Sequence, residues 1–238
     1  MRRVFSLILV ALCCTLVLSS QTRNWSFSIT TGATYTTSAK IFYNPDSPSA
    51  ELRSQSNDFD GLYGGNIEIR FLIPAYDLSL SLYAEYLSKT RDEFQYVGST
   101  SPAIQTQVKE VFRIFPIELG IYVNIPVGGE SIRLAMGGGL GVYYGVRTLQ
   151  IGGVKALQEN NPLAFGIHVG TNFDYRVNSR ISFRAQMRFR DPEVITESRF
   201  ESPAAIINDQ AVLISRDIIK SKINVNGLCF GLGIVIDL

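Results

Sequence analysis

The chain has few of the residues that usually carry catalysis or metal binding. Its 238 residues include three cysteines and one histidine. Cys13 and Cys14 lie in an apolar N-terminal segment, so removal of this segment leaves Cys229 alone, without a disulfide or a cysteine-based metal site. Basic and acidic side chains number 22 and 21, which implies neither nucleic acid nor an acidic surface as a partner. No cofactor is expected.

Long apolar runs are also scarce. The one candidate, residues 4–18, follows Arg2 and Arg3 and precedes Ser19 and Ser20. A basic start, a short apolar stretch and small residues are typical of a secretory signal peptide, here about residues 1–20. The stretch is short for a bilayer-spanning helix. Residues 21–238 then fit a single domain.

What the chain does contain is regular alternation. Eight segments place an apolar residue at every second position, with small or polar residues between them. They are residues 25–35, 63–73, 78–86, 115–125, 132–144, 163–175, 181–189 and 228–238. Side chains of a strand point alternately to opposite faces, so each segment has one apolar and one polar face. The pattern predicts an all-β fold, an eight-stranded antiparallel up-and-down transmembrane β-barrel.

The connections between these segments alternate in length. Residues 74–77, 126–130 and 177–180 predict tight turns, whereas residues 38–60, 89–107, 152–161 and 191–217 predict long polar loops. Bacterial outer-membrane barrels have short periplasmic turns and long outer loops. Two irregularities are expected: a break or bulge at Pro116, which lacks a backbone donor, and a bulge near Asn226 and Gly227, where the alternation changes phase.

The composition of the two faces favours a membrane over water. A soluble up-and-down barrel shows a charged face to solvent. Here the polar face consists mainly of Gly, Ser, Ala and Asn and is poor in Lys, which suits a narrow lumen. Trp25 and Tyr35 stand ten residues apart on the apolar face. In a tilted strand this spacing spans about 25 Å, the height of a lipid-facing band.

Taken together, these features resemble the OmpA/OmpX-like superfamily of small eight-stranded outer-membrane barrels. The resemblance covers nearly all of residues 21–238, as architecture rather than as a motif. In that family the last strand carries alternate hydrophobic residues, usually ending on an aromatic, and the barrel-insertion machinery reads them. The matching residues are Phe230, Leu232, Ile234, Ile236 and Leu238, with leucine in place of the aromatic. The resemblance implies the outer membrane of a Gram-negative bacterium, with outer-membrane lipids around the barrel.

His168 is the one candidate for catalytic chemistry. Its phase places it in the lumen, and the resemblance admits a lipid-modifying role, since some barrels of this size are such enzymes. A histidine base needs a nucleophile within reach and an acid to orient its ring, and no spacing singles out a serine. A structural interior histidine is the simpler interpretation, and no catalytic, cofactor-binding or metal-ligating residue is assigned.

Charged residues on the polar faces form a stronger pattern. Eight strands leave an interior just wide enough for side chains, and unpaired buried charges are costly, so a packed and paired plug is expected rather than a solvated channel. Counting residues from the short turns places Glu85, Glu118, His168 and Arg188 at similar heights in the lumen. It places Arg70, Arg133, Asp174 and Arg184 lower, nearer the short turns. The predicted lumen residues are Glu68, Arg70, Glu85, Glu118, Arg133, His168, Asp174, Arg184 and Arg188.

The sequence therefore favours a non-enzymatic envelope protein. Its long loops, residues 38–60, 89–107, 152–161 and 191–217, would face outward and meet an unknown extracellular partner or maintain the envelope. Two alternatives remain open: a lipid A deacylase or acyltransferase that uses His168, and a small-solute pore.

Overall fold

The computed structural model describes residues 26–97, 104–126, 129, 131–214 and 217–238. The predicted signal peptide, residues 1–20, and Trp25 lie outside this range. All eight predicted strands are present, and most are longer than predicted. They are β1 (Ser26–Phe42), β2 (Ser56–Ile73), β3 (Leu78–Val97), β4 (Ile104–Ile125), β5 (Ile132–Ile151), β7 (Ala164–Arg176), β8 (Ile181–Arg190) and β13 (Leu228–Asp237).

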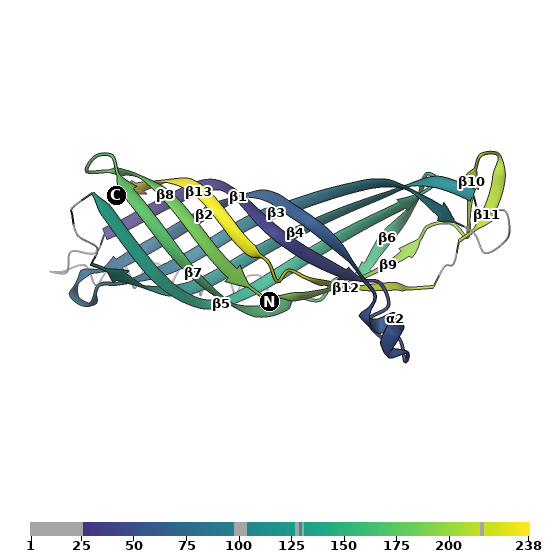
Figure 1. Ribbon diagram of the computed structural model, residues 1–238, viewed down its shortest axis with the longest axis horizontal. Coiled ribbons are helices and arrows are strands. Elements are labelled where there is room, and N and C mark those ends of the chain that lie inside the picture. Colours follow the sequence, from purple (N-terminus) through teal and green to yellow (C-terminus); the bar gives the residue numbers. More distant parts are fainter. Residues whose placement is uncertain (1–25, 98–103, 127–128, 130, 215–216) are drawn as a thin grey trace, which may run out of the picture.

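These eight strands form a closed antiparallel ring. The strand order runs β5-β4-β3-β2-β1-β13-β8-β7, and β7 also pairs with β5, which closes the barrel. Figure 1 shows the tilted strands wrapping around one axis, with the short turns and the C-terminus at one end. One of these turns contains a 3-10 helix, η1 (Pro74–Tyr76). No helix in the described part of the chain is long and apolar enough to cross a membrane.

The segments predicted as long loops are largely strand, and this corrects the sequence prediction. β1 to β5 continue away from the short turns, in the direction that we call upward. Three further strands join them there: β6 (Val154–Asn160), β9 (Glu193–Phe200) and β12 (Ile219–Asn224). β12 pairs with both β9 and β1, and β6 joins β9 to β5. We call this outer ring the extension. Beside it lies α2 (Ala50–Ser54), and beyond it lies a hairpin of β10 (Ala204–Ile207) and β11 (Gln210–Leu213), at the far right of Figure 1.

The two expected irregularities appear as different features. Thr36 pairs with Cys229, but Lys40 pairs with Asn224, so one extra residue lies on the β12–β13 side, near Gly227. This register shift is the bulge that the phase change predicts. At Pro116 the pairing with β5 continues in register, so β4 has no bulge there. The ladder with β3 is interrupted between Ile117 and Ile114, which is the local break that a missing backbone donor predicts.

The outer surface of the barrel carries an apolar band with aromatic rings at its upper edge. Tyr35 and Tyr63 stack with centroids 5.0 Å apart, and Phe115 lies 5.2 Å from Tyr86 and 6.3 Å from Tyr144. These five rings, which we call the girdle, mark the level at which such barrels leave the hydrocarbon region. Below the girdle the exposed residues are mostly apolar; examples are Ile67, Leu82, Ile117, Leu119, Leu140, Ile167 and Leu232.

Above the girdle the apolar face turns inward. On β4 the exposed Phe115 is followed upward by the buried Ile114 and Phe112, while Arg113 faces solvent. The inversion follows from the change of surroundings, because the wall is bathed by lipid below the girdle and by water above it. The extension is therefore built as a water-exposed barrel with an apolar core, placed on top of a membrane barrel with a polar lumen.

Candidate functional site

The lower part of the lumen is held by a cluster of ion pairs centred on Glu68 of β2. Its carboxylate accepts hydrogen bonds from Arg70 at 2.6 Å and from Arg184 at 2.5 Å, and another from the Ser81 hydroxyl. Arg184 also donates two bonds to Asp174, at 2.6 and 2.8 Å. Charge-assisted, two-point bonds of this kind are strong, and they fix the guanidinium in one orientation.

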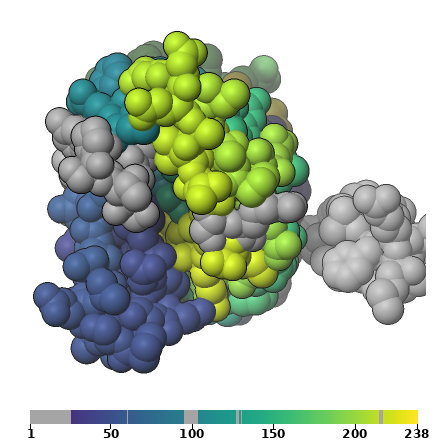
Figure 2. Space-filling model, turned by 90° about the vertical axis from the view of Figure 1, so that its right-hand side faces the viewer, coloured from purple at the N-terminus to yellow at the C-terminus, as the bar shows by residue number. Residues whose placement is uncertain are grey.

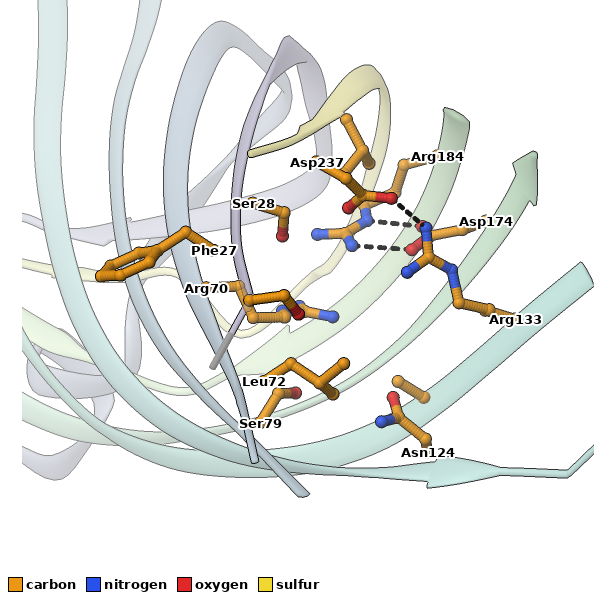
Figure 3. A pocket seen from close by; sticks show the side chains of 13 residues that line it. Phe27, Ser28, Arg70, Leu72, Ser79, Asn124, Arg133, Asp174, Arg184 and Asp237 are labelled. Carbon is orange, nitrogen blue, oxygen red and sulfur yellow. Dashed lines mark hydrogen bonds and ion pairs between the residues drawn. The ribbon is translucent and has the colours of Figure 1, made fainter. Parts of the chain in front are cut away.

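A small cavity lies between this cluster and the inner mouth of the barrel. Its lining includes Arg70, Arg184 and Asn124, which Figure 3 shows from close by. At the mouth, Arg133 of β5 donates to Asp237 of β13 at 2.7 Å, across the opening. The cavity has a volume of about 50 Å³, enough for a few water molecules. It is too small to hold a substrate.

A second cluster fills the lumen at the height of Glu118 of β4. The carboxylate contacts Arg188 in a close ion pair, lies 3.3 Å from Arg190, and accepts a hydrogen bond from the Tyr143 hydroxyl at 2.8 Å. His168 approaches the same carboxylate with its Nδ1 atom at 3.8 Å, beyond hydrogen-bond distance. The side chain of His168 is 1% exposed.

The second cluster extends toward β3 and β13. Arg190 forms an ion pair with Glu85 at 2.5 Å, and the Cys229 thiol lies 3.7 Å from the same carboxylate. The Arg188 guanidinium stacks over the Tyr83 ring at 3.6 Å. This stacking and the pairing with Glu118 hold Arg188 on two sides, because a guanidinium can bind a carboxylate and an aromatic face together.

The charges in the lumen balance. Each of the buried guanidiniums faces at least one buried carboxylate. Pairing of this kind offsets the large cost of taking charges out of water. The set comprises the four acids Glu68, Glu85, Glu118 and Asp174 and the four arginines Arg70, Arg184, Arg188 and Arg190.

An apolar layer lies above the charged clusters, at and beyond the girdle. Side chains from eight strands meet there, and nearly all of them are fully buried. Above this layer, Arg147 donates to Glu110 at 2.5 Å and to the Ser221 hydroxyl at 2.5 Å. The members of the apolar layer include Ala39, Ile41, Phe59, Leu62, Leu87, Phe112, Ile114, Val194, Ile223 and Val225.

Tyr43, which follows β1, contacts the Arg147–Glu110 pair. The Tyr43 hydroxyl donates to Glu110 at 3.4 Å, and the Arg147 guanidinium lies 5.2 Å from the Tyr43 ring. Burial raises the pKa of the Tyr43 hydroxyl, and the adjacent Glu110 carboxylate raises it further. The hydroxyl therefore remains protonated at neutral pH and serves as a donor.

The structure places the nine sequence-predicted lumen residues inside the barrel, and eight of them are buried. Arg133 is the exception, with a side chain 33% exposed at the mouth. Glu118, His168 and Arg188 lie together, while Glu85 pairs with Arg190 instead. Sequence reasoning did not select Arg190, although it stands two residues beyond Arg188 on the same face of β8. Glu110 and Arg147 were also missed, because they lie in the extension.

The chemistry available in the lumen is limited. In the described part of the chain no group of three or more His, Cys, Asp or Glu side chains is arranged to hold a metal ion. His168 is enclosed by the barrel wall: a Cβ atom on Gly120 would lie 3.0 Å from its Nε2. The arrangement is that of a packed polar interior.

Comparisons with known proteins support the architecture. No protein-family model and no curated protein match the chain. Among solved structures, it is similar to the outer membrane protein OprG from Pseudomonas aeruginosa, with a TM-score of 0.55 and 14% identity over 90% of this chain and 95% of that one. Two further structures are the Escherichia coli outer membrane protease OmpT, with a TM-score of 0.49 and 11% identity over 92% of this chain and 100% of that one, and Neisserial surface protein A, with a TM-score of 0.47 and 12% identity over 90% and 99%.

The fold and its apolar outer band define the class of this protein. It is a small integral β-barrel of the kind found in bacterial outer membranes. More narrowly, its eight membrane strands and its short inner turns give it the fold of the OmpA/OmpX-like barrels.

Proposed function

We propose that this protein is a non-enzymatic outer-membrane protein whose extension makes contacts outside the cell. The observation that carries the proposal is the extension itself. Its wall continues as a ring of strands past the girdle, and it has its own apolar core. A rigid scaffold that carries loops and hairpins into the surroundings is a common way to present a binding surface.

The enclosure of His168 argues against the enzymatic alternative. A lipid substrate would lie in the membrane or at its surface, whereas the His168 side chain is 1% exposed inside the wall. A general base has to come within hydrogen-bond distance of the proton that it removes. A lipid headgroup therefore has no route to this imidazole without opening of the barrel.

The filled lumen argues against the pore. The two charged clusters and the apolar layer follow one another along the axis, and eight strands leave little space beside them. The inner cavity ends at Arg184 and Arg70. A conducting path would require the ion pairs of Glu68 and Glu118 to separate.

The experiment compares the wild-type protein with a trimmed variant in a heterologous Gram-negative host. In the variant, residues 44–55 and 202–214 are each replaced by a short turn, which removes α2 and the β10–β11 hairpin, together with the contacts of that hairpin with Ile104, Ile151 and Val154, but leaves the apolar layer. We expect both proteins to insert, and the trimmed variant to lose adhesion of cells to surfaces or to one another. Unchanged adhesion would overturn the proposal, and increased sensitivity to detergent in its place would favour a role in envelope integrity.

The enzymatic alternative has its own control in the same host. His168→Ala and the wild-type protein are compared by mass spectrometry of lipid A. We expect identical lipid A in both strains and in the empty host. A modification that appears with the wild-type protein and disappears with His168→Ala would replace our proposal with the lipid-modifying enzyme.

A further inference from the structure

The wall of the extension has a gap in its backbone pairing between β2 and β3. The described pairing of these two strands ends at Tyr63 and Ser88. Above this point β2 still pairs with β1 as far as Ser56, and β3 still pairs with β4 as far as Val97. Residues 56–62 and 90–97 therefore each present a strand edge toward the other. We call the gap between these two edges the seam.

The seam is an open cleft that the Arg91 side chain crosses. Its volume is about 320 Å³, and its lining comes from Asp58 and Phe59 on β2 and from residues 89–93 on β3. Arg91 reaches from β3 to β2, where its Nη2 donates to the Asp58 carbonyl oxygen at 3.2 Å and its guanidinium lies 4.8 Å from the Phe59 ring. Its Nη1 is buried without a hydrogen-bond partner. The Arg91 side chain thus lies where backbone hydrogen bonds between β2 and β3 would otherwise form.

Free strand edges are templates for another strand. Their N–H and C=O groups point sideways in a fixed repeat, and proteins use such edges to bind extended peptides by strand addition. Hydrogen-bonded strands lie about 4.8 Å apart, so two edges that one arginine can bridge leave room for roughly one strand. The seam is therefore too narrow for the wall of a second barrel, which disfavours a second copy of this chain as its occupant.

The charges around the seam indicate the chemistry of the occupant. On the outer face, Asp58 of β2 and Asp92 of β3 are both exposed, one on each side of the gap. Asp58 also forms an exposed ion pair with Lys40 at 4.0 Å, which an incoming cation would share, and Arg91 pairs with Glu93 at 3.1 Å. On the inner face the buried Phe59 ring is apolar. An inserted strand that places a lysine or arginine outward, between the two carboxylates, and apolar residues inward would match both faces.

We propose that the seam binds an extended, basic polypeptide segment of an extracellular partner by strand addition, with Arg91 leaving the Asp58 carbonyl as the strand enters. This inference rests on the proposed function and names the class of partner. The added strand would bond to the backbone of β3, and its outward cation would lie between Asp58 and Asp92.

The test uses the mature protein in detergent micelles and a nine-residue probe peptide of alternating valine and threonine with a central lysine. Binding is followed by NMR through the backbone amides of residues 90–94. We expect shifts and slower hydrogen exchange at these amides. A peptide with two central N-methyl groups keeps its side chains but loses backbone donors, and we expect at least about 10-fold weaker binding. A peptide methylated only at its N-terminal residue is the control and should bind like the parent.

Three variants test which side chains of the seam contribute to binding of the probe peptide. Arg91→Ala removes the side chain that crosses the gap, so we expect several-fold tighter binding of the probe. Asp92→Lys places a cation beside the lysine of the probe, and we expect about 3- to 10-fold weaker binding. Glu201→Lys makes the same charge change on an exposed residue outside the seam and should leave binding unchanged.

The outcomes decide between strand addition and other modes of contact. Absence of binding to both the wild-type protein and Arg91→Ala would overturn the inference. Equal binding of the N-methylated and parent peptides would overturn it too, since it would show recognition by side chains alone. Either result leaves the adhesion and lipid A experiments untouched, so failure of the seam is distinguishable from failure of the proposed function.

Discussion

At the scale of single residues, Arg188 makes contacts on two sides that a substitution would remove. It forms an ion pair with Glu118, stacks on Tyr83 and is buried. Arg188→Ala would leave Glu118 with one fewer cation in a dry lumen, at a cost of roughly 3–5 kcal/mol in the free energy of unfolding. Urea unfolding in lipid vesicles, followed by tryptophan fluorescence or gel mobility, measures this loss.

The control for this substitution is Arg113→Ala. Arg113 carries the same charge but is exposed on the outer face of the extension. Surface substitutions of this kind stay within about 0.5 kcal/mol. If both variants lose the same stability, Arg188 is not held by its buried contacts.

Gly227 is a second residue whose environment has a measurable consequence. A Cβ atom there would lie 2.7 Å from both the backbone nitrogen and the backbone oxygen of Ser38. Because backbone atoms cannot move aside cheaply, Gly227→Ala should destabilise the barrel by about 1–3 kcal/mol. Gly65→Ala is the matched control, since its nearest contact would be 3.4 Å, and it should change stability little. Comparable losses in urea unfolding would count against the tight bulge.

The partners of the lumen residues could not be predicted from sequence, although their facing could. Alternation alone places Glu68 and Arg184 on the inner face. Their contact joins residues 116 apart in the chain, and it depends on the stagger of strands around the ring. A shift of two residues in one strand keeps the facing and changes every pair. For this reason Glu85 faces Arg190 rather than Arg188.

At the scale of elements, the membrane strands were predictable and the extension was not. Below the girdle one face is uniformly apolar, so the period of two is plain in the sequence. Above it the alternation continues on β4 with Phe112 and Ile114 inside, but Glu110 also faces inward. A segment that has a polar residue on its buried face and polar residues on its outer face is predicted from sequence as a loop. The length of β3 and β4 therefore depended on pairing that one strand alone does not reveal.

The last strand, β13, provides the test of the lipid-facing side. Ile234 is exposed on the outer surface, where it pairs in register with Thr31 and Phe183. Ile234→Lys should cost about 2–4 kcal/mol if the position lies near the bilayer midplane, and less near the interface. It would also interrupt the proposed insertion signal of alternate hydrophobic residues. Yield in the outer-membrane fraction and heat resistance in detergent measure both effects.

A lysine placed outside the lipid band serves as the control. Val111 also faces outward, on β4, but it stands above the girdle residue Phe115 and pairs with Thr90 and Thr148. Val111→Lys should insert and resist heat like the wild-type protein, because water surrounds this part of the wall. Equal behaviour of the two lysine variants would mean that the outer face of β13 is assigned wrongly.

At the scale of the whole molecule, the interior is organised in layers along the barrel axis. Charged clusters fill the membrane portion, an apolar layer begins at the girdle, and the Arg147–Glu110 pair lies above it. Each layer suits its surroundings: polar groups face inward where lipid lies outside, and apolar groups face inward where water lies outside. The same strands therefore satisfy both environments by one change of phase.

This layering predicts the electrical behaviour of the protein. An ion that crosses the barrel would have to pass the paired charges at Glu68 and Glu118 and then the apolar layer, where mainly apolar side chains would replace its water. We expect no sustained current from the purified wild-type protein in a planar bilayer at neutral pH. Arg188→Ala should remain closed as well, because the apolar layer above it is unchanged. Sustained open-channel current from the wild-type protein would refute the packed interior and favour the small-solute pore. Current from Arg188→Ala alone would instead show that the charged cluster, and not the apolar layer, closes the barrel.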